Sequence, residues 1–210
     1  MNSNFIQITI MLIISYLLGA IPNGVWIGKA FFHKDIRQFG SGNIGTTNTY
    51  RVLGPIAGTV VMVLDISKGA IATLLPTLMH NYTISPLIYG VMAILGHTFS
   101  IFDHFKGGKA VATSAGMLLA YRPELFILAA AIWLSLIFIT SMVSLASMIA
   151  FTIITIVTFI IGETFLGILA LFLTIFIFYR HRNNIKRILN GNESLVPFGL
   201  YYWWQTTHKK

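Results

Sequence analysis

The chain has 210 residues, of which 56% are hydrophobic and 10% are charged, and its mean hydropathy is +0.78. This is more apolar surface than a soluble domain of that length can bury, so the composition predicts an integral membrane protein. The net charge of +8 fits anionic lipid, an anionic substrate or basic cytoplasmic loops. The absence of cysteine excludes disulfides, thiolate metal sites and a cysteine nucleophile.

Apolar segments separated by short polar connections predict seven transmembrane helices, forming one all-α domain over residues 1–210. The segments occupy residues 5–28, 54–79, 86–102, 110–121, 125–140, 144–161 and 164–179. The first Lys or Arg is Lys29, so the first segment lacks the basic leader of a cleaved signal peptide. We therefore expect that segment to be a retained span.

The distribution of basic residues predicts the topology. If the N-terminus lies outside, the polar stretches 29–53, 103–109, 141–143 and 180–210 are cytoplasmic. Of the 14 Lys and Arg residues, all but Arg122 and Lys68 then fall inside, as the positive-inside bias requires. The C-terminus is expected to be cytoplasmic, and three polar regions far apart in sequence would share one face of the membrane.

Two opposite charges fall within the second apolar segment. Asp65 and Lys68 are spaced i, i+3 and would meet on one face of a helix, which lowers the cost of placing either in hydrocarbon. We expect a structural ion pair, or a break between two half-helices near Gly69. A catalytic role for the pair is the alternative.

The first polar region reads FGSGNIGTTNTYR, residues 39–51. Its glycines allow the positive φ angles that tight anion-binding turns need, and short polar side chains surround them. The alternative is an ordinary turn that caps the next helix. The candidate binding residues are Ser41, Gly42, Asn43, Thr47, Asn48 and Arg51.

The second polar region, residues 96–114, contains FKGGKAVATS. Gly107, Gly108 and Lys109 precede a helix-compatible run, so the unpaired amides at that helix start would face a phosphate. It is not a P-loop, because Ala110 stands where Ser or Thr would bind magnesium. The alternative is a helix start flanked by lysines that snorkel at the membrane interface.

His97 and His104 lie near Asp103 in the same region, which raises the possibility of a metal site. No third and fourth ligand stand at a recognisable spacing. We therefore expect histidines that form hydrogen bonds or order the loop, and no metal.

The third polar region, YRHRNNIKRILNGNE, covers residues 179–193 and follows the last apolar segment. If the helix continues past the membrane, His181 and Asn184 share one of its faces, and an imidazole beside an amide can orient or deprotonate a hydroxyl. The alternative is a basic cluster that binds lipid headgroups. Further candidates here are Arg187 and Glu193.

Together the three regions resemble, in order and spacing, the three signatures of the bacterial acyl-phosphate:glycerol-3-phosphate acyltransferases, the PlsY type. The first, S-G-N-x-G-A-T-N followed by Arg, is similar to residues 41–48 and Arg51. The second, G-H-x-x-P-x-F-x-x-F-x-G-G-K, is similar to residues 96–109, and the third, H-x-x-N-I-x-R then G-x-E, to residues 181–193. Two positions depart from the signatures: Thr46 replaces alanine and Ser100 replaces proline.

The resemblance implies a seven-helix enzyme of the bacterial cell membrane with its active site at the cytoplasmic face. It implies transfer of a fatty acyl group from acyl phosphate to the 1-hydroxyl of sn-glycerol 3-phosphate, giving lysophosphatidic acid. We expect membrane lipids and the two substrates as partners, with no cofactor and no nucleic acid. Acyl phosphate is a mixed anhydride with a good leaving group, so positioning and charge stabilisation suffice without a covalent acyl-enzyme.

The resemblance also assigns roles to the candidate residues. We predict that the glycerol phosphate is held by Arg51, Lys109, His181 and Asn184. The acyl phosphate would be held by Ser41, Asn43, Thr47 and the Gly107–Gly108 amides. Further donors to the site would come from Ser144 and Ser147, and further substrate contacts from Gly42, Asn48, Arg187 and Glu193.

Two other functions are compatible with parts of the sequence. A transporter for a phosphorylated metabolite could use an intramembrane ion pair and a basic face, but the charges cluster at one interface and do not cross the midplane. Another type of acyltransferase would need a histidine-x4-aspartate signature, whereas His97 and Asp103 have five residues between them. G-x-S-x-G is also missing, which disfavours a serine hydrolase.

Overall fold

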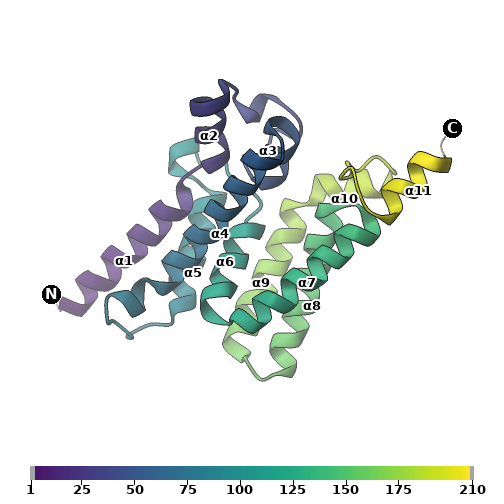
Figure 1. Cartoon of the computed structure of the whole chain (residues 1–210). Helices are drawn as coiled ribbons and strands as arrows, with labels where there is room; N and C mark the ends of the chain where they lie inside the picture. Colours follow the sequence, from purple (N-terminus) through teal and green to yellow (C-terminus); the bar gives the residue numbers. More distant parts are fainter. Residues whose placement is uncertain (1–2, 209–210) are drawn as a thin grey trace. The chain divides into compact units, whose positions relative to one another are not determined.

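The structure is a computed structural model that describes residues 3–208, in which helices are joined by loops and no strand occurs (Figure 1). The predicted all-α fold class is therefore confirmed. Lys209 and Lys210, which the charge pattern assigns to the cytoplasm, lie outside the described residues.

The chain forms two compact units, residues 1–123 and 124–210, and each is described by itself. The first contains α1 (Ser3–Ala20), α2 (Asn23–Phe32), η1 (Ile36–Gln38), α3 (Thr46–Leu53), α4 (Pro55–Leu78), α5 (Pro86–Thr98), η2 (Ile101–Asp103) and α6 (Val111–Tyr121). The second contains α7 (Pro123–Thr140), α8 (Val143–Ile160), α9 (Thr164–Arg180), α10 (Arg182–Leu189) and α11 (Leu200–His208). The boundary between the units falls after Pro123, the first residue of α7.

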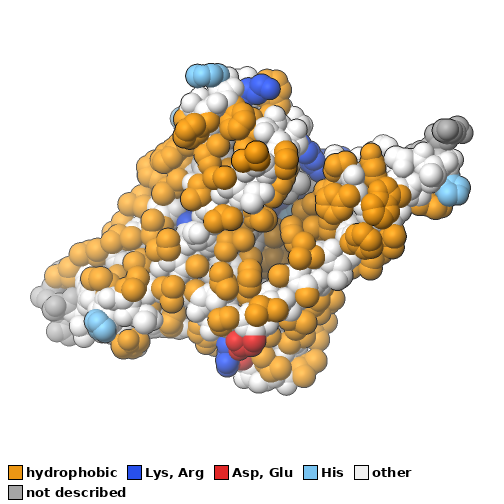
Figure 2. All heavy atoms as spheres, viewed as in Figure 1, with side chains coloured by type: hydrophobic (Ala, Val, Ile, Leu, Met, Phe, Trp, Pro, Cys, Tyr) orange, Lys and Arg blue, Asp and Glu red, His pale blue; other side chains and the backbone are white. Residues whose placement is uncertain are grey.

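Several helices are long and apolar enough to cross a membrane. Among the described residues, four helical segments are each long and apolar enough by themselves: Pro55–Leu78, Pro86–Asp103, Pro123–Thr140 and Val143–Ile160. Two bent pairs, α1 with α2 and α9 with α10, bring the number to six if each pair is one span. The remaining predicted span corresponds to α6, which is apolar but shorter. Hydrophobic side chains cover most of the surface in view, as a lipid-facing protein requires (Figure 2).

The two bent pairs correct two of the predictions. The expected first span, residues 5–28, is broken after Ala20, and its halves meet at 47°. Pro22 explains the break, because it has no amide hydrogen and restricts the residue before it. The last helix also does not continue straight: it ends at Arg180 and resumes at Arg182 after a bend of 60°. This second break coincides with the end of the apolar sequence.

Helix α4 is the central helix of the first unit, in contact with α1, α3, α5 and α6. It runs unbroken through Gly69, so the predicted break there is wrong. Gly69 instead permits a close approach, because a methyl group at this position would overlap the Thr113 carbonyl of α6. The predicted ion pair is confirmed: Lys68 Nζ lies 2.8 Å from Asp65 Oδ1.

Candidate active site

The first polar region forms a loop that is organised around Asn48, on α3. Gly40 and Gly42 adopt positive φ angles of 61° and 69°, which supply the tight turns. The Asn48 side chain is buried, and its Oδ1 accepts a hydrogen bond from the Ser41 amide at 2.8 Å. Its Nδ2 donates to the carbonyl oxygens of Ile36 and Phe39, at 2.9 and 3.2 Å. Asn48 thus shapes this loop, and its predicted substrate contact stays a prediction.

Other side chains of the region lie around the start of α3. Asn43 Oδ1 accepts the Gly45 amide at 3.0 Å, an Asx-type turn that leads into the helix. Thr47 is partly exposed in the first turn of α3, and Arg51 is exposed in its last turn. The expected helix after the glycine loop therefore forms, and the candidate cation, Arg51, lies one turn after Thr47.

The second polar region folds into a tight turn before α6. His104, Phe105 and Ala110 have positive φ angles, and α6 begins at Val111, within one residue of the expected start. The Gly108 amide donates to the His97 carbonyl oxygen at 3.1 Å. A methyl group at Gly107 would overlap this carbonyl, and one at Gly108 would overlap the His97 ring. Only glycine fits at these two positions.

The signature position where proline is usual has a structural role in this chain. Ser100 is buried, and its hydroxyl donates to the Ala20 carbonyl oxygen at the end of α1. Its own carbonyl oxygen accepts the amides of Asp103 and Phe105, at 3.1 and 2.7 Å. Ser100 thereby anchors the loop before the glycines by hydrogen bonds.

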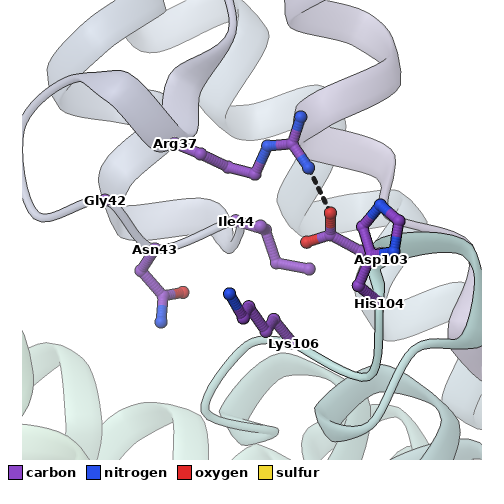
Figure 3. Close-up of a pocket in the computed structure, with 8 residues that line it drawn as sticks. Arg37, Gly42, Asn43, Ile44, Asp103, His104 and Lys106 are labelled. Atoms are coloured by element: carbon purple, nitrogen blue, oxygen red, sulfur yellow. Dashed lines mark hydrogen bonds and ion pairs between the residues drawn. The ribbon is translucent and has the colours of Figure 1, made fainter.

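A pocket of about 300 Å³ lies between the first two polar regions (Figure 3). Figure 3 shows the Lys106 ammonium extending between Asn43 and Asp103. The pocket is lined by Arg37, Gly42, Asn43, Ile44, Asp103, His104, Lys106 and Gly107. Two regions separated by some 60 residues of sequence thus contribute to one concave surface, whose charged side chains are the cations Arg37 and Lys106 and the carboxylate Asp103.

Arg37 connects the two sides of this pocket. Its guanidinium forms an ion pair with the buried Asp103 (Figure 3). It forms a second ion pair with Asp35. Hydrogen bonds from Arg37 hold the pKa of the Asp35 carboxyl well below its usual range. Sequence reasoning missed the pair between Arg37 and Asp103, because the two residues are 66 positions apart and their meeting depends on the fold.

The third polar region belongs to the second unit and centres on Glu193. Its Oε1 accepts hydrogen bonds from Ser144 Oγ at 2.7 Å and from Asn184 Nδ2 at 2.6 Å, and its Oε2 accepts Arg187 Nε at 2.8 Å. Burial raises the pKa of the Glu193 carboxyl, but these hydrogen bonds outweigh burial and hold the pKa below its usual value. Glu193 is therefore an ionised anchor for its three neighbours.

His181 occupies the bend between α9 and α10 and is buried. Its Nδ1 lies 2.9 Å from the Ile177 carbonyl oxygen, which can only accept, so Nδ1 carries the proton. In the neutral ring Nε2 is then the basic nitrogen. Ser147, by contrast, donates to the Val143 carbonyl oxygen and accepts from Trp133 Nε1. Its predicted place in the site stays a prediction.

Comparison with known proteins identifies the family. A model of the family "Glycerol-3-phosphate acyltransferase" matches residues 9–191. The chain belongs to the PlsY family of glycerol-3-phosphate acyltransferases. The resemblance found in the three signatures is thus confirmed, and the chain is a membrane acyltransferase that acts on glycerol 3-phosphate.

Close relatives and solved structures agree with this assignment. The glycerol-3-phosphate acyltransferase of Levilactobacillus brevis is 67% identical over 91% of this chain and 95% of its own length. That of Lactiplantibacillus plantarum is 65% identical over 92% and 94%. The crystal structure of the integral membrane enzyme PlsY (YgiH) in its glycerol 3-phosphate form has a TM-score of 0.84 and 35% identity, over 90% of this chain and 94% of that one. Its lysophosphatidic acid form has a TM-score of 0.80 and 34% identity.

Proposed function

We propose that the chain transfers a fatty acyl group from acyl phosphate to the 1-hydroxyl of sn-glycerol 3-phosphate, with lysophosphatidic acid and phosphate as products. The observation that carries this proposal is the pocket where the glycine loop meets the Gly107 turn, lined by the Lys106 ammonium, the Asn43 side chain and glycine backbone. Such a surface suits phosphate groups, which both substrates carry. The glycerol 3-phosphate and lysophosphatidic acid forms of the PlsY crystal structures support the same substrate and product.

In the proposed reaction, the substrate hydroxyl oxygen bonds to the acyl carbonyl carbon, and the bond from that carbon to the phosphate oxygen breaks. Phosphate leaves with the bonding electron pair, and the hydroxyl proton ends on phosphate, directly or through His181 Nε2. The hydrogen bond from Nδ1 to Ile177 supports the indirect route, because it leaves Nε2 as the acceptor. The residues assigned to the glycerol phosphate are Arg51, Lys109, His181 and Asn184.

The acyl phosphate is assigned to the first two polar regions, through Ser41, Asn43, Thr47 and the Gly107–Gly108 turn. Of the two amides predicted to bind it, that of Gly108 donates to the His97 carbonyl oxygen in this structure. Oriented backbone amides stabilise the charge that develops on the carbonyl oxygen in the transition state. Gly42 lines the same pocket. We also propose that the chain is one acyltransferase domain, since the family match runs across the boundary between the two compact units.

The donor is tested with the purified protein in detergent, supplied with glycerol 3-phosphate and one of three donors. Palmitoyl phosphate is expected to support turnover, while palmitoyl-CoA and palmitoyl-acyl carrier protein are not, because neither brings a phosphate to the reacting carbonyl. Release of radiolabelled lysophosphatidic acid measures the reaction. Turnover with either thioester donor and none with palmitoyl phosphate would make the donor assignment wrong.

We further propose seven membrane spans, with α6 and each bent pair counted as one span, an outside N-terminus and the active site at the cytoplasmic face. The chain has no cysteine, so a single introduced cysteine is the only thiol in the protein that a maleimide can label. In intact cells, an impermeant maleimide is expected to label Arg122→Cys and to label Lys186→Cys only after permeabilisation. Labelling of Lys186→Cys in intact cells would contradict this orientation.

A further inference from the structure

A buried polar cluster lies within the first unit, outside the pocket. It joins Asn23 of α2, Asp65 and Lys68 of α4, and His97 of α5. Asp65, Lys68 and His97 are only 2–5% exposed. Asn23 Nδ2 donates to Asp65 Oδ1 at 2.9 Å, and the same oxygen lies 2.8 Å from Lys68 Nζ. The two charges and the imidazole are buried and Asn23 is partly buried, so the polar groups of the cluster depend on one another.

Lys68 determines the protonation of His97. Its Nζ has three acceptors within hydrogen-bond distance: Asp65 Oδ1 at 2.8 Å, the Ile21 carbonyl oxygen at 3.1 Å and His97 Nδ1 at 2.8 Å. An ammonium group has three hydrogens to donate and accepts none. All three are used, and His97 Nδ1 must therefore be the acceptor. In the neutral ring the proton then lies on Nε2.

The protonated edge of His97 faces the glycine turn. The ring atom nearest to a methyl group placed on Gly108 would be Nε2. The carbonyl oxygen of the same histidine accepts the Gly108 amide at 3.1 Å. Both the backbone and the ring of His97 therefore support the turn, and the ring presents its N–H donor on the side of the turn.

We propose that Asp65 and Lys68 act as positioning residues for the Gly107–Gly108 turn, by fixing His97 in the tautomer whose Nε2–H points toward that turn. The proposal rests on the proposed function, in which the turn holds a substrate phosphate. His97 then supports the turn from its buried side, and Lys68 and Asp65 act through it.

The energetic cost of burying the charges of Asp65 and Lys68 supports their role as positioning residues. Two charges buried among apolar helices lose their hydration, and an apolar pair of similar volume would often be as stable. An ion pair within α4 would be complete without an imidazole as the third acceptor of the ammonium. The link from Lys68 through His97 to the glycine turn gives the buried pair a role in the site.

The tautomer is tested directly on the wild-type protein. Nitrogen-15 NMR of histidine-labelled protein in lipid nanodiscs, with His97 assigned by loss of its signals in His97→Gln, distinguishes a protonated from a bare ring nitrogen. A bare Nδ1 and a protonated Nε2 are expected at pH 7. The opposite tautomer, or a doubly protonated ring, would overturn the proposal. This readout does not depend on acyltransfer.

The effect on the site is tested with Asp65→Asn/Lys68→Met, which removes both charges together and leaves neither unpaired. We expect KM for the phosphate substrates to rise about tenfold, with the Nδ1 and Nε2 signals of His97 averaged between tautomers. Thr73→Val is the matched control, because Thr73 is a buried α4 residue whose hydroxyl donates within its own helix. If the wild-type protein turns over palmitoyl phosphate and the folded double variant has the same KM, the positioning role is wrong. The proposed function would then still stand.

Two substitutions at His97 separate the ring's donor from its bulk. His97→Gln keeps an amide nitrogen near the position of Nε2, whereas the shorter His97→Asn reaches only the position of Nδ1. His97→Gln is therefore expected to retain at least several-fold more activity than His97→Asn. Equal activity of the two variants would contradict a donor role for Nε2. Absence of palmitoyl phosphate turnover in the wild-type protein would instead overturn the proposed function and leave the NMR result standing.

Discussion

Replacing Lys109 with alanine is expected to lower kcat/KM by on the order of 10²–10³-fold, while the protein stays folded. Lys109 directly follows the Gly107–Gly108 turn and precedes α6. Its backbone is therefore fixed between the turn and the start of α6, and its side chain is partly buried. A cation at this point stabilises the negative charge of a phosphate and of the transition state, and water cannot replace it in a partly buried site. Steady-state kinetics with palmitoyl phosphate measure the loss.

Controls separate this role from a general effect of charge. Lys34→Ala removes an exposed lysine from the same unit, outside the pocket, and is expected to keep wild-type kinetics. Lys109→Arg keeps the charge in a different shape and should recover part of the activity. Arg51→Ala is expected to resemble Lys109→Ala. Full activity in both alanine variants would make the phosphate-binding interpretation of the two regions wrong.

The local features of this chain were predictable because they depend on residues close in sequence. Apolar runs indicated the helices, the i, i+3 spacing of Asp65 and Lys68 indicated their ion pair, and the helix-compatible run after Gly108 indicated the start of α6 to within one residue. In each case the deciding geometry is that of one helix or one turn.

What sequence reasoning missed depends on partners far along the chain. Arg37 pairs with Asp103, and Lys68 bonds to His97, and neither pair follows from spacing. The buried Asn48 amide organises the glycine loop through the Ser41 amide and the Ile36 carbonyl oxygen, a role that spacing also does not predict. The bend at His181 was missed because the periodicity of a helical sequence does not show where the helix axis changes direction.

Replacing Glu193 with glutamine is expected to lower the free energy of unfolding by about 2–3 kcal/mol and to reduce activity strongly. The substitution keeps the shape and one oxygen, so Ser144 and Asn184 can still donate to Oε1. The amide that replaces Oε2 would face Arg187 Nε, and two donors would meet without an acceptor. The melting temperature in detergent should fall by on the order of 5–10 °C. Activity should fall because Asn184, assigned to the glycerol phosphate, loses its charged anchor.

The pH dependence distinguishes this mechanism from loss of packing. The folded-state pKa of Glu193 lies below its usual value, so its contribution to stability is present above the unfolded pKa of about 4.3 and is lost as the pH falls through the folded value. The melting temperatures of wild type and Glu193→Gln should therefore differ most near neutral pH and approach each other in acid. Glu124→Gln, an exposed control in the first turn of α7, should stay within about 0.5 kcal/mol of wild type. A difference between wild type and Glu193→Gln that is constant with pH would show that the carboxylate charge does not carry the effect.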